Sequence, residues 1–249
     1  MRQIPGDAES DVNIGKFRFG GPSIAEDIRS KYGYDGDLLS IFSENTGAVV
    51  QKWHHYIPLY DRYFGRFRSA PVRFLEIGVS KGGSLQMWRK YFGPKAILYG
   101  IDIDPECAKF DGQAGVVRIG SQDDAGFLAE VVGEMGGVDI VLDDGSHRMD
   151  HIRRSLLALY PMLNPGGLYM IEDLHTAYSS TYGGAFASKE NFFFDLLKII
   201  DDMHRAYHGQ RAQMPELGQV PSGIHVHDSI VVLEKGAVHR PVHSRVGER

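Results

Sequence analysis

The sequence predicts an α/β fold built around a mostly parallel sheet. Short apolar runs of strand length alternate with longer amphipathic segments, and acidic or glycine residues stand where several of these runs end. Because parallel neighbours need long crossover connections, each amphipathic segment is expected to be a helix that joins two strands. The expected strands are VRFLEIGV (72–79), AILYGIDI (96–103), GVVRIG (115–120), VDIVLDD (138–144) and GLYMIED (167–173).

Four further segments frame this sheet. Residues 1–22 show no clear period and are rich in Gly, Asp and Ser, which indicates a flexible arm. From about Ile24 to Phe67, apolar and aromatic residues recur at helical spacing, and a later helix is expected over about 189–208. Near the end, GIHVHDSIVVLEKG (223–236) predicts two short strands that form a hairpin.

Composition and charge limit the classes of function. The chain has 249 residues, of which 43% are hydrophobic and 24% charged, enough for one folded α/β domain with an appended segment. A net charge of -5 and an isoelectric point of about 6.1 provide no general attraction for nucleic acid. The single cysteine, Cys107, cannot form an intramolecular disulfide and suits a reducing compartment. Since no signal-peptide core or membrane-length apolar run is visible, we expect a cytoplasmic protein that binds neither nucleic acid nor membranes.

The first expected strand leads into a glycine loop, FLEIGVSKGGSLQMW (74–88). Gly78 and Gly82 let the backbone turn and approach a ligand, while the following helix start presents unpaired N–H groups. The spacing is not the dinucleotide fingerprint GxGxxG, because Ser80 stands where that pattern has glycine. Glu76 precedes the first glycine by two residues and suits an ammonium group better than a pyrophosphate. Such turns also occur in purely structural connections, so the loop alone is weak support for a site.

The next two strand ends add polar groups to the same edge. Asp102 follows Gly78 by 24 residues, where doubly wound folds commonly place an acid on ribose hydroxyls. After the third strand, Ser121 and Gln122 are placed to edge a purine, and an equally good interpretation has Ser121 or Asp123 capping a helix. The three strand ends would then line one groove at the carboxyl edge of the sheet.

Two later strands each end in a pair of acids, Asp143 with Asp144 and Glu172 with Asp173. Successive residues of a strand point to opposite faces, so Asp143 and Asp144 should have different roles. Carboxylates gathered at one edge repel one another unless a cation or donor groups intervene, and oxygen ligands favour Mg²⁺, Ca²⁺ or Mn²⁺. The alternative is that these acids cap helices or pair with nearby arginines, namely Arg148, Arg153 and Arg154.

A histidine follows the first acidic pair. His147 lies three residues after Asp144, where an imidazole near a metal could take a proton from a hydroxyl. Its ordinary pKa of ~6.5 suits a general base at neutral pH. A surface histidine that opens a helix is the competing interpretation, and the acids at both strand ends favour the catalytic one.

Taken together, these motifs resemble the class I S-adenosylmethionine-dependent methyltransferases. The similarity is to the metal-dependent sugar O-methyltransferases of antibiotic biosynthesis, and it covers about residues 46–236. This resemblance implies a Rossmann-like sheet, mostly parallel with a C-terminal antiparallel hairpin strand, preceded by a helical segment. It also implies a deoxysugar acceptor such as a rhamnose, either nucleotide-linked or on a macrolide, enediyne or polyketide scaffold. The motifs that carry it are FLEIGVSKGGS, GIDIDP, LDDGSH, IEDLHTAY and IHVHDSIVVLEKG.

The resemblance also implies roles for individual residues. The cofactor S-adenosylmethionine would be held at the first three strand ends, at Asp143, and by an upstream histidine and tyrosine. A Mg²⁺ ion would be held by Asp144, Glu172 and Asp173. The catalytic residues would be His147, as general base, and Asp144. The implied cofactor-binding residues are Glu76, Gly78, Ser80, Gly82, Asp102, Ser121, Gln122, Asp143, His54 and Tyr56.

Two segments depart from the family's pattern. The family often has Thr-Asp-Lys before the upstream histidine, whereas this chain has TGAVVQKWHH, which puts the roles of Thr46 and Lys52 in doubt. In the late strand, HVHDS replaces the usual aromatic pair, so His227 is expected to change how the hairpin packs or reads the substrate.

We expect the chain to divide into four parts. Residues 1–22 form the arm, 23–70 a helical segment that serves as lid or oligomer interface, 71–236 the cofactor-binding catalytic domain, and 237–249 a tail. The aromatic-rich helices lead us to expect a homo-oligomer.

The expected reaction is methyl transfer to a sugar hydroxyl, made nucleophilic by Mg²⁺ and by His147. Methylation of a catechol or another phenol would use the same core, so it remains an alternative. A non-catalytic binding protein of the same fold is disfavoured by the retained acids and histidine. A nicotinamide oxidoreductase is disfavoured by the missing GxGxxG.

Overall fold

The computed structural model describes residues 14–247, so residues 1–13 of the expected arm lie outside the described residues. Its centre is a seven-stranded sheet of order β3-β2-β1-β4-β5-β7-β6, in which β1 to β5 are parallel and β7 runs antiparallel to both neighbours. This confirms the expected mostly parallel sheet with a closing hairpin. The strands are β1 (Arg73–Ile77), β2 (Ile97–Asp102), β3 (Val116–Ile119), β4 (Val138–Asp143), β5 (Leu163–Ile171), β6 (Gly223–His227) and β7 (Ile230–Glu234).

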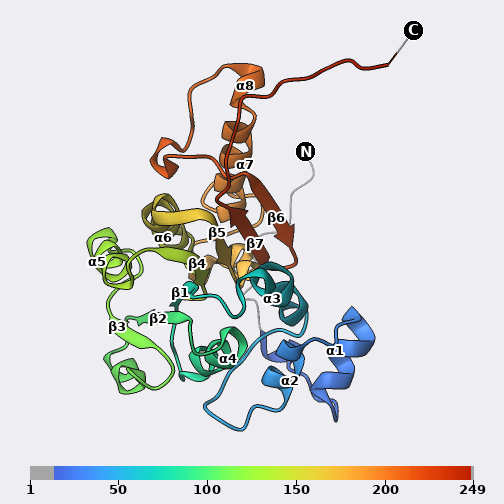
Figure 1. Ribbon diagram of the computed structural model, residues 1–249, viewed down its shortest axis with the longest axis vertical. Coiled ribbons are helices and arrows are strands. Elements are labelled where there is room, and N and C mark those ends of the chain that lie inside the picture. Colours follow the sequence, from blue (N-terminus) through green and yellow to red (C-terminus); the bar gives the residue numbers. More distant parts are fainter. Residues whose placement is uncertain (1–13, 248–249) are drawn as a thin grey trace, which may run out of the picture.

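Helices precede the sheet and connect its strands, and in Figure 1 the helices α1 to α4, coloured blue to green, lie together. The helices before the sheet are α1 (Ile24–Tyr32), α2 (Asp37–Ser43), α3 (Tyr56–Phe64) and the 3₁₀ turns η1 (Ile14–Phe17) and η2 (Gly65–Phe67). Those between strands are α4 (Gly83–Phe92), η3 (Pro105–Phe110), α5 (Ala125–Met135), α6 (Met149–Leu159) and η4 (Tyr160–Met162). Between β5 and β6 lie η5 (Leu174–Tyr178), η6 (Ser180–Tyr182), α7 (Phe192–Met203), α8 (Arg205–His208) and η7 (Pro215–Leu217).

Side-chain caps set several helix starts. Ser23 caps α1 by accepting from the Glu26 amide, and Asp104 caps η3, as its position before Pro105 predicts. For α5 the expected caps, Ser121 and Asp123, are wrong: the carboxylate of Asp124 accepts from the amides of Gly126 and Phe127. The helix begins one residue later than a cap at Asp123 and three later than a cap at Ser121 would place it, which leaves Ser121 and Gln122 at the strand end.

The two faces of the sheet carry separate hydrophobic clusters because side chains alternate along a strand. Leu75, Ile77 and Val141 belong to the cluster that α5, α6 and α7 cover. Phe74, Ile140 and Leu142 belong to the cluster with the aromatic residues of α3 and α4. Trp88 of α4 centres the second cluster, with its ring 5.1 Å from Tyr60, 5.6 Å from Phe64 and 5.3 Å from Phe74.

The strand register aligns the polar ends. Ile77 pairs with Asp143, which pairs with Ile171. The ladder then continues one residue beyond the strands, because the amide of Asp144 donates to Ile77 at 3.0 Å and that of Glu172 donates to Asp143 at 3.0 Å. Glu76, Asp144 and Glu172 therefore share one face of the sheet, and Asp143 points to the other.

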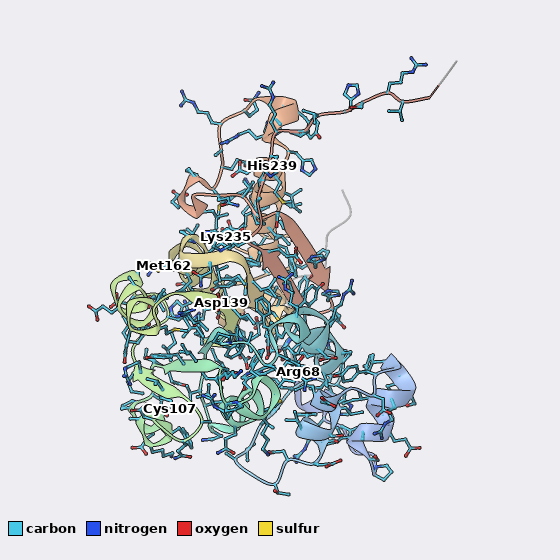
Figure 2. The ribbon with its side chains drawn as sticks, viewed as in Figure 1. Arg68, Cys107, Asp139, Met162, Lys235 and His239 are labelled. Carbon is cyan, nitrogen blue, oxygen red and sulfur yellow. The ribbon has the colours of Figure 1, made fainter. Side chains whose placement is uncertain are left out.

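Other features lie away from this edge. Figure 2 places Cys107, on η3, at the opposite end of the molecule from His239 of the C-terminal tail.

Within residues 14–247, no helix is long and apolar enough to cross a membrane.

Candidate functional site

A lysine lies between two of the strand-end carboxylates. Lys52 Nζ is 2.6 Å from Asp144 Oδ2 and 2.8 Å from Glu172 Oε2, and only 2% of the lysine side chain is exposed. Burial by itself lowers the pKa of Lys52, but the two carboxylates outweigh it and raise that pKa above its ordinary value. The ammonium therefore stays charged and offsets part of the repulsion among the acids.

Aromatic donors from the segment before the sheet hold the remaining inner oxygens. The Tyr60 hydroxyl donates to Glu172 Oε1 at 2.6 Å, while the Tyr56 hydroxyl and Trp53 Nε1 donate to Asp173 Oδ1 at 2.8 and 3.1 Å. Burial and the Asp144 charge raise the pKa of Glu172, and Lys52 opposes this rise. The helical N-terminal segment is thus part of the site and does more than cover it.

His147 faces the outer oxygens of the cluster. Its Nε2 is 3.9 Å from Asp144 Oδ1 and 3.8 Å from Asp173 Oδ2, which is beyond hydrogen-bond distance. The three residues each offer one ligand atom, and these atoms lie within 4.8 Å of one another. Glu172 lies deeper, with each of its oxygens already bonded to Lys52 or Tyr60. The carboxylate oxygens open to a metal are therefore those of Asp144 and Asp173, and His147 Nε2 faces both of them.

The backbone at this cluster is held in an uncommon conformation. His147 and Asp173 have φ of 57° and 55°, in the left-handed region that costs a non-glycine residue about 1–3 kcal/mol. The Thr176 hydroxyl lies 3.2 Å from the carbonyl of His147 and 2.7 Å from that of Asp173, so it ties the two loops together. Such strain persists where the surroundings fix a functional geometry.

The alternative partners of the strand-end acids are engaged elsewhere. In the described part of the chain, the ion pairs of the three candidate arginines go to acids outside the cluster. Asp173 precedes η5 without capping it through its side chain. These observations favour a functional site over helix capping or arginine pairing. The pairs are Arg148 with Asp150, Arg153 with Asp195 and Arg154 with Asp123.

The glycine loop packs closely against the acidic loop. Gly78 has φ of 98°, and a Cβ there would lie 2.2 Å from the carbonyl oxygen of Asp144, so only glycine fits. The Asp102 carboxylate accepts from the amides of Val79 and Ser80, each at 2.9 Å, and so fixes the loop. Gly82, with φ of 76°, turns the chain into α4. The sequence-predicted Gly78, Ser80, Gly82 and Asp102 are therefore brought together.

Glu76 is buried with one oxygen unused. Its Oε1 accepts from the Ser84 hydroxyl and from Trp88 Nε1, the latter at 3.1 Å. Its Oε2 has no hydrogen-bond partner among residues 14–247. Burial raises the pKa of Glu76 to about 7, against the opposing effect of Lys52. A buried carboxylate oxygen without a donor is costly and fits a site for a ligand cation.

Asp143 lies on the opposite face with a full set of donors. Ser155 and Tyr169 donate to its Oδ2 at 2.6 and 3.0 Å, and Gln122 Nε2 donates to Oδ1 at 3.1 Å. Gln122 Oε1 in turn accepts from the Ser146 amide at 2.7 Å, which links the loops after β3 and β4. Ser121, partly exposed beside them, donates to Asp123. Gln122 and Asp143 thus have internal partners, and a direct cofactor contact from Asp143 stays a prediction.

The remaining expected residues separate in space. His54 Nδ1 lies 2.7 Å from Asp27 Oδ2 and its ring packs 4.8 Å from Phe19, so its observed contacts join α1 to the segment before α3. Tyr56 instead reaches Asp173. His227 pairs with the Tyr63 hydroxyl at 2.8 Å, so it ties β6 to α3.

The sequence left Lys52 in doubt and did not assign Trp53 or Tyr60. One signal could have found Tyr60: Tyr56 and Tyr60 are four residues apart, so they lie on one face of α3, and their hydroxyls reach Asp173 and Glu172. The helical spacing over about 24–67 predicts that Lys52 and Trp53 are helical, whereas α3 begins only at Tyr56, so that spacing does not give the direction of their side chains.

Comparison with known proteins places the chain among methyltransferases. Residues 75–174 match the family model of a methyltransferase domain. The 8-demethyl-8-(2-methoxy-alpha-L-rhamnosyl)-tetracenomycin-C 3'-O-methyltransferase of Streptomyces olivaceus is 39% identical over 223 residues, which are 84% of this chain and 56% of the relative. Demethylmacrocin O-methyltransferase of Streptomyces fradiae is 36% identical over 209 residues, 76% of this chain and 51% of the relative.

A solved structure shares the fold. The MycE methyltransferase of the mycinamycin biosynthetic pathway, in complex with Mg, SAH and mycinamycin VI, is 34% identical with a TM-score of 0.66. The match covers 86% of this chain and 55% of that one. The chain spans about half the length of the curated relatives it matches. By sequence and fold, the chain is placed with the methyltransferases: residues 75–174 match a methyltransferase domain, and most of the chain is similar to the rhamnosyl-tetracenomycin O-methyltransferase and to MycE.

Proposed function

We propose that this protein transfers a methyl group from S-adenosylmethionine to a hydroxyl of a deoxysugar with the help of a divalent ion. The observation that carries the proposal is the shared edge: Glu76, with its unpartnered oxygen, lies on the same face as Asp144 and Glu172. A buried carboxylate oxygen without a donor and a group of candidate metal ligands therefore share one face, as transfer from a sulfonium to a chelated hydroxyl requires.

The residues fit both groups. The free Oε2 of Glu76 suits the ammonium of the cofactor's amino acid part, and the loop of Gly78, Ser80 and Gly82 suits close backbone approach. Asp102 is half-buried beside that loop, where it would meet the ribose, with Ser121 and Gln122 at the next strand end. For Mg²⁺, Asp144 and Asp173 offer outward carboxylate oxygens, and Glu172 lies behind them. His54, Tyr56 and Asp143 have no such opening, so their proposed cofactor contacts rest on the family resemblance.

The reaction needs a base and a fixed geometry. The acceptor oxygen forms a bond to the sulfonium methyl as the carbon–sulfur bond breaks, and the hydroxyl proton passes to His147 Nε2. When bound, Mg²⁺ would supply positive charge that lowers the pKa of the acceptor hydroxyl. His147 is 21% exposed, with its Nε2 turned to both acids, so it can reach a hydroxyl at the cluster. General base assistance contributes typically about 10²- to 10⁴-fold.

The sugar acceptor is supported by the relatives. Their names specify methylation of rhamnosyl, mycinamicin and olivosyl compounds, and an antibiotic glycoside or its nucleotide-linked sugar is the corresponding acceptor here. We place the reaction in the cytoplasm and expect residues 23–70 to mediate self-association beside the domain at 71–236. Size-exclusion chromatography with light scattering measures the oligomeric state.

The direct test is a methyl-transfer assay with labelled S-adenosylmethionine. A nucleotide-linked deoxysugar and a rhamnosylated scaffold are compared with a catechol, each with Mg²⁺ and with excess EDTA. We expect transfer to a sugar substrate that EDTA abolishes and Mg²⁺ restores. Full activity in EDTA would contradict the metal requirement, and preference for the catechol would contradict the sugar assignment.

A further inference from the structure

The Lys52 ammonium lies between two carboxylates of the acidic cluster, Asp144 and Glu172. It contacts Asp144 Oδ2 and Glu172 Oε2 at 2.6 and 2.8 Å, from a side chain that is 2% exposed. The same two residues belong to the proposed ligand set. Lys52 therefore supplies, within the chain, the positive charge that the acids need.

The lysine is delivered by a segment that is itself fixed. The Asn45 side chain donates to the carbonyl of Ala48 at 2.9 Å, and the Ala48 amide donates to Gln86 of α4 at 3.2 Å. A Cβ at Gly83 would lie 2.2 Å from the Val49 carbonyl oxygen, so the segment runs directly over the start of α4. The backbone that carries Lys52 is thus packed on the sheet domain. This packing holds the lysine in contact with the two acids.

The carboxylate oxygens are divided between two directions. Glu172 is fully used, by Lys52 on one oxygen and by Tyr60 on the other. Asp144 gives one oxygen to Lys52, while its Oδ1 faces His147. Mg²⁺ binds oxygens at about 2.0–2.1 Å, and a dication and an ammonium on the same carboxylates repel each other strongly at a buried site. Full ligation by Asp144 and Glu172 therefore opposes the Lys52 contact.

We infer that Lys52 is a resident counter-cation that competes with the divalent ion for Asp144 and Glu172. It keeps the acidic edge folded when no metal is bound, and it weakens metal binding when metal is present. The inference rests on the proposed function, because it takes these acids as metal ligands. The charge compensation itself is testable without metal.

The first measurement is thermal unfolding in EDTA of the full chain and of Lys52→Met, which has a similar length and no charge. Removing one partner of a buried ion pair leaves an uncompensated charge, so we expect the melting temperature of Lys52→Met to fall by about 5–15 °C. Adding Glu172→Gln to Lys52→Met should recover part of that loss, because one of the two carboxylates left without a counter-charge is then neutral. If the double variant melts no higher than Lys52→Met, counter-charge is not the role of Lys52.

The second measurement is Mg²⁺ and Mn²⁺ binding by calorimetry and by the rise in melting temperature. Lys52→Met should bind either ion roughly tenfold tighter and gain more stability from it than the unchanged protein. Lys52→Arg keeps the charge and should stay close to the unchanged protein. The matched control is Lys198→Met: Lys198 pairs with Asp195 at 2.8 Å on α7, and its loss should leave metal affinity unchanged.

The outcomes separate the two proposals. If the unchanged protein binds neither ion, the proposed metal site fails, while the EDTA comparison of the single and double variants still tests the counter-cation. If the unchanged protein binds Mg²⁺ and Lys52→Met binds it equally or more weakly, competition is refuted and the metal site stands. If Lys52→Met is unfolded in EDTA, its refolding on addition of Mg²⁺ supports the inference. If it does not refold with Mg²⁺ while Lys52→Arg is folded both in EDTA and with Mg²⁺, competition is refuted.

Discussion

Asp143 and Asp144 are neighbours in the chain, yet they lie in opposite kinds of environment. Asp143 is buried among the neutral donors Ser155, Tyr169 and Gln122. The hydrogen bonds of its carboxylate are therefore all made by side chains of the folded core. Asp144 shares a lysine with Glu172 and turns its other oxygen to His147. A carboxylate closed by neutral donors stabilises the fold, whereas one balanced by a cation and left open on one side can exchange partners with a ligand.

The largest expected effect is on turnover, at the side of Asp144 that faces His147. Replacing His147 with Ala should lower the turnover of methyl transfer by about 10²- to 10⁴-fold, because the proton acceptor is lost. The affinity for S-adenosylmethionine, measured by calorimetry, should stay nearly unchanged, since Glu76 and the glycine loop remain. Normal turnover in this variant would remove His147 from the role of general base.

The raised pKa of Glu76 predicts how the free energy of unfolding of the cofactor-free protein depends on pH. Its pKa is raised by burial from 4.5 to about 7, so the folded protein holds this proton over a range where the unfolded chain releases it. The contribution of Glu76 is therefore fully present below pH 4.5 and is lost as pH rises towards 7, by about 3 kcal/mol. Urea unfolding of the protein and of Glu76→Gln across this range isolates the effect. An equal pH dependence in both proteins would show that Glu76 is not the group responsible.

The adjacent aspartates can be compared directly with isosteric variants. Asp144→Asn should weaken Mg²⁺ binding by about 10- to 100-fold at the least, because even an outer partner of a metal ligand is worth that much. Asp143→Asn should lower the free energy of unfolding by about 1–3 kcal/mol and leave Mg²⁺ affinity near its original value. Calorimetry and urea titration of the two variants provide the comparison. A loss of metal affinity in Asp143→Asn would erase the distinction between the faces.

The smallest expected effect separates two matched tyrosines. Tyr60 donates to Glu172 on the open face and Tyr169 donates to Asp143 on the closed one. Each Tyr→Phe change should cost about 1–3 kcal/mol of stability, because a buried carboxylate loses a donor. Only Tyr60→Phe should change Mg²⁺ affinity, since Glu172 adjoins the proposed ligands. Equal metal affinities in both variants would place Glu172 outside the metal site.

The sequence by itself determined the sheet and the separation of the two aspartates. Strand periodicity is local, so the apolar runs could be read as strands, and alternation put Asp143 and Asp144 on opposite faces. In a parallel sheet the carboxyl ends of the strands meet at one edge. The sequence therefore predicted that Glu76, Asp102, Asp144 and Glu172 lie near one another.

Only the tertiary structure decided what balances those acids. Lys52 meets Asp144 and Glu172 across 92 and 120 residues of chain, and Trp53 meets Asp173 across 120. Those contacts depend on how the N-terminal segment folds over the edge of the sheet, and the helical spacing of that segment does not predict the non-helical stretch between α2 and α3 that carries Lys52 and Trp53. Because like charges repel, the sequence predicted a cation or donor groups among the carboxylates, and the fold provides both from its own chain, in Lys52 and in the hydroxyl of Tyr60.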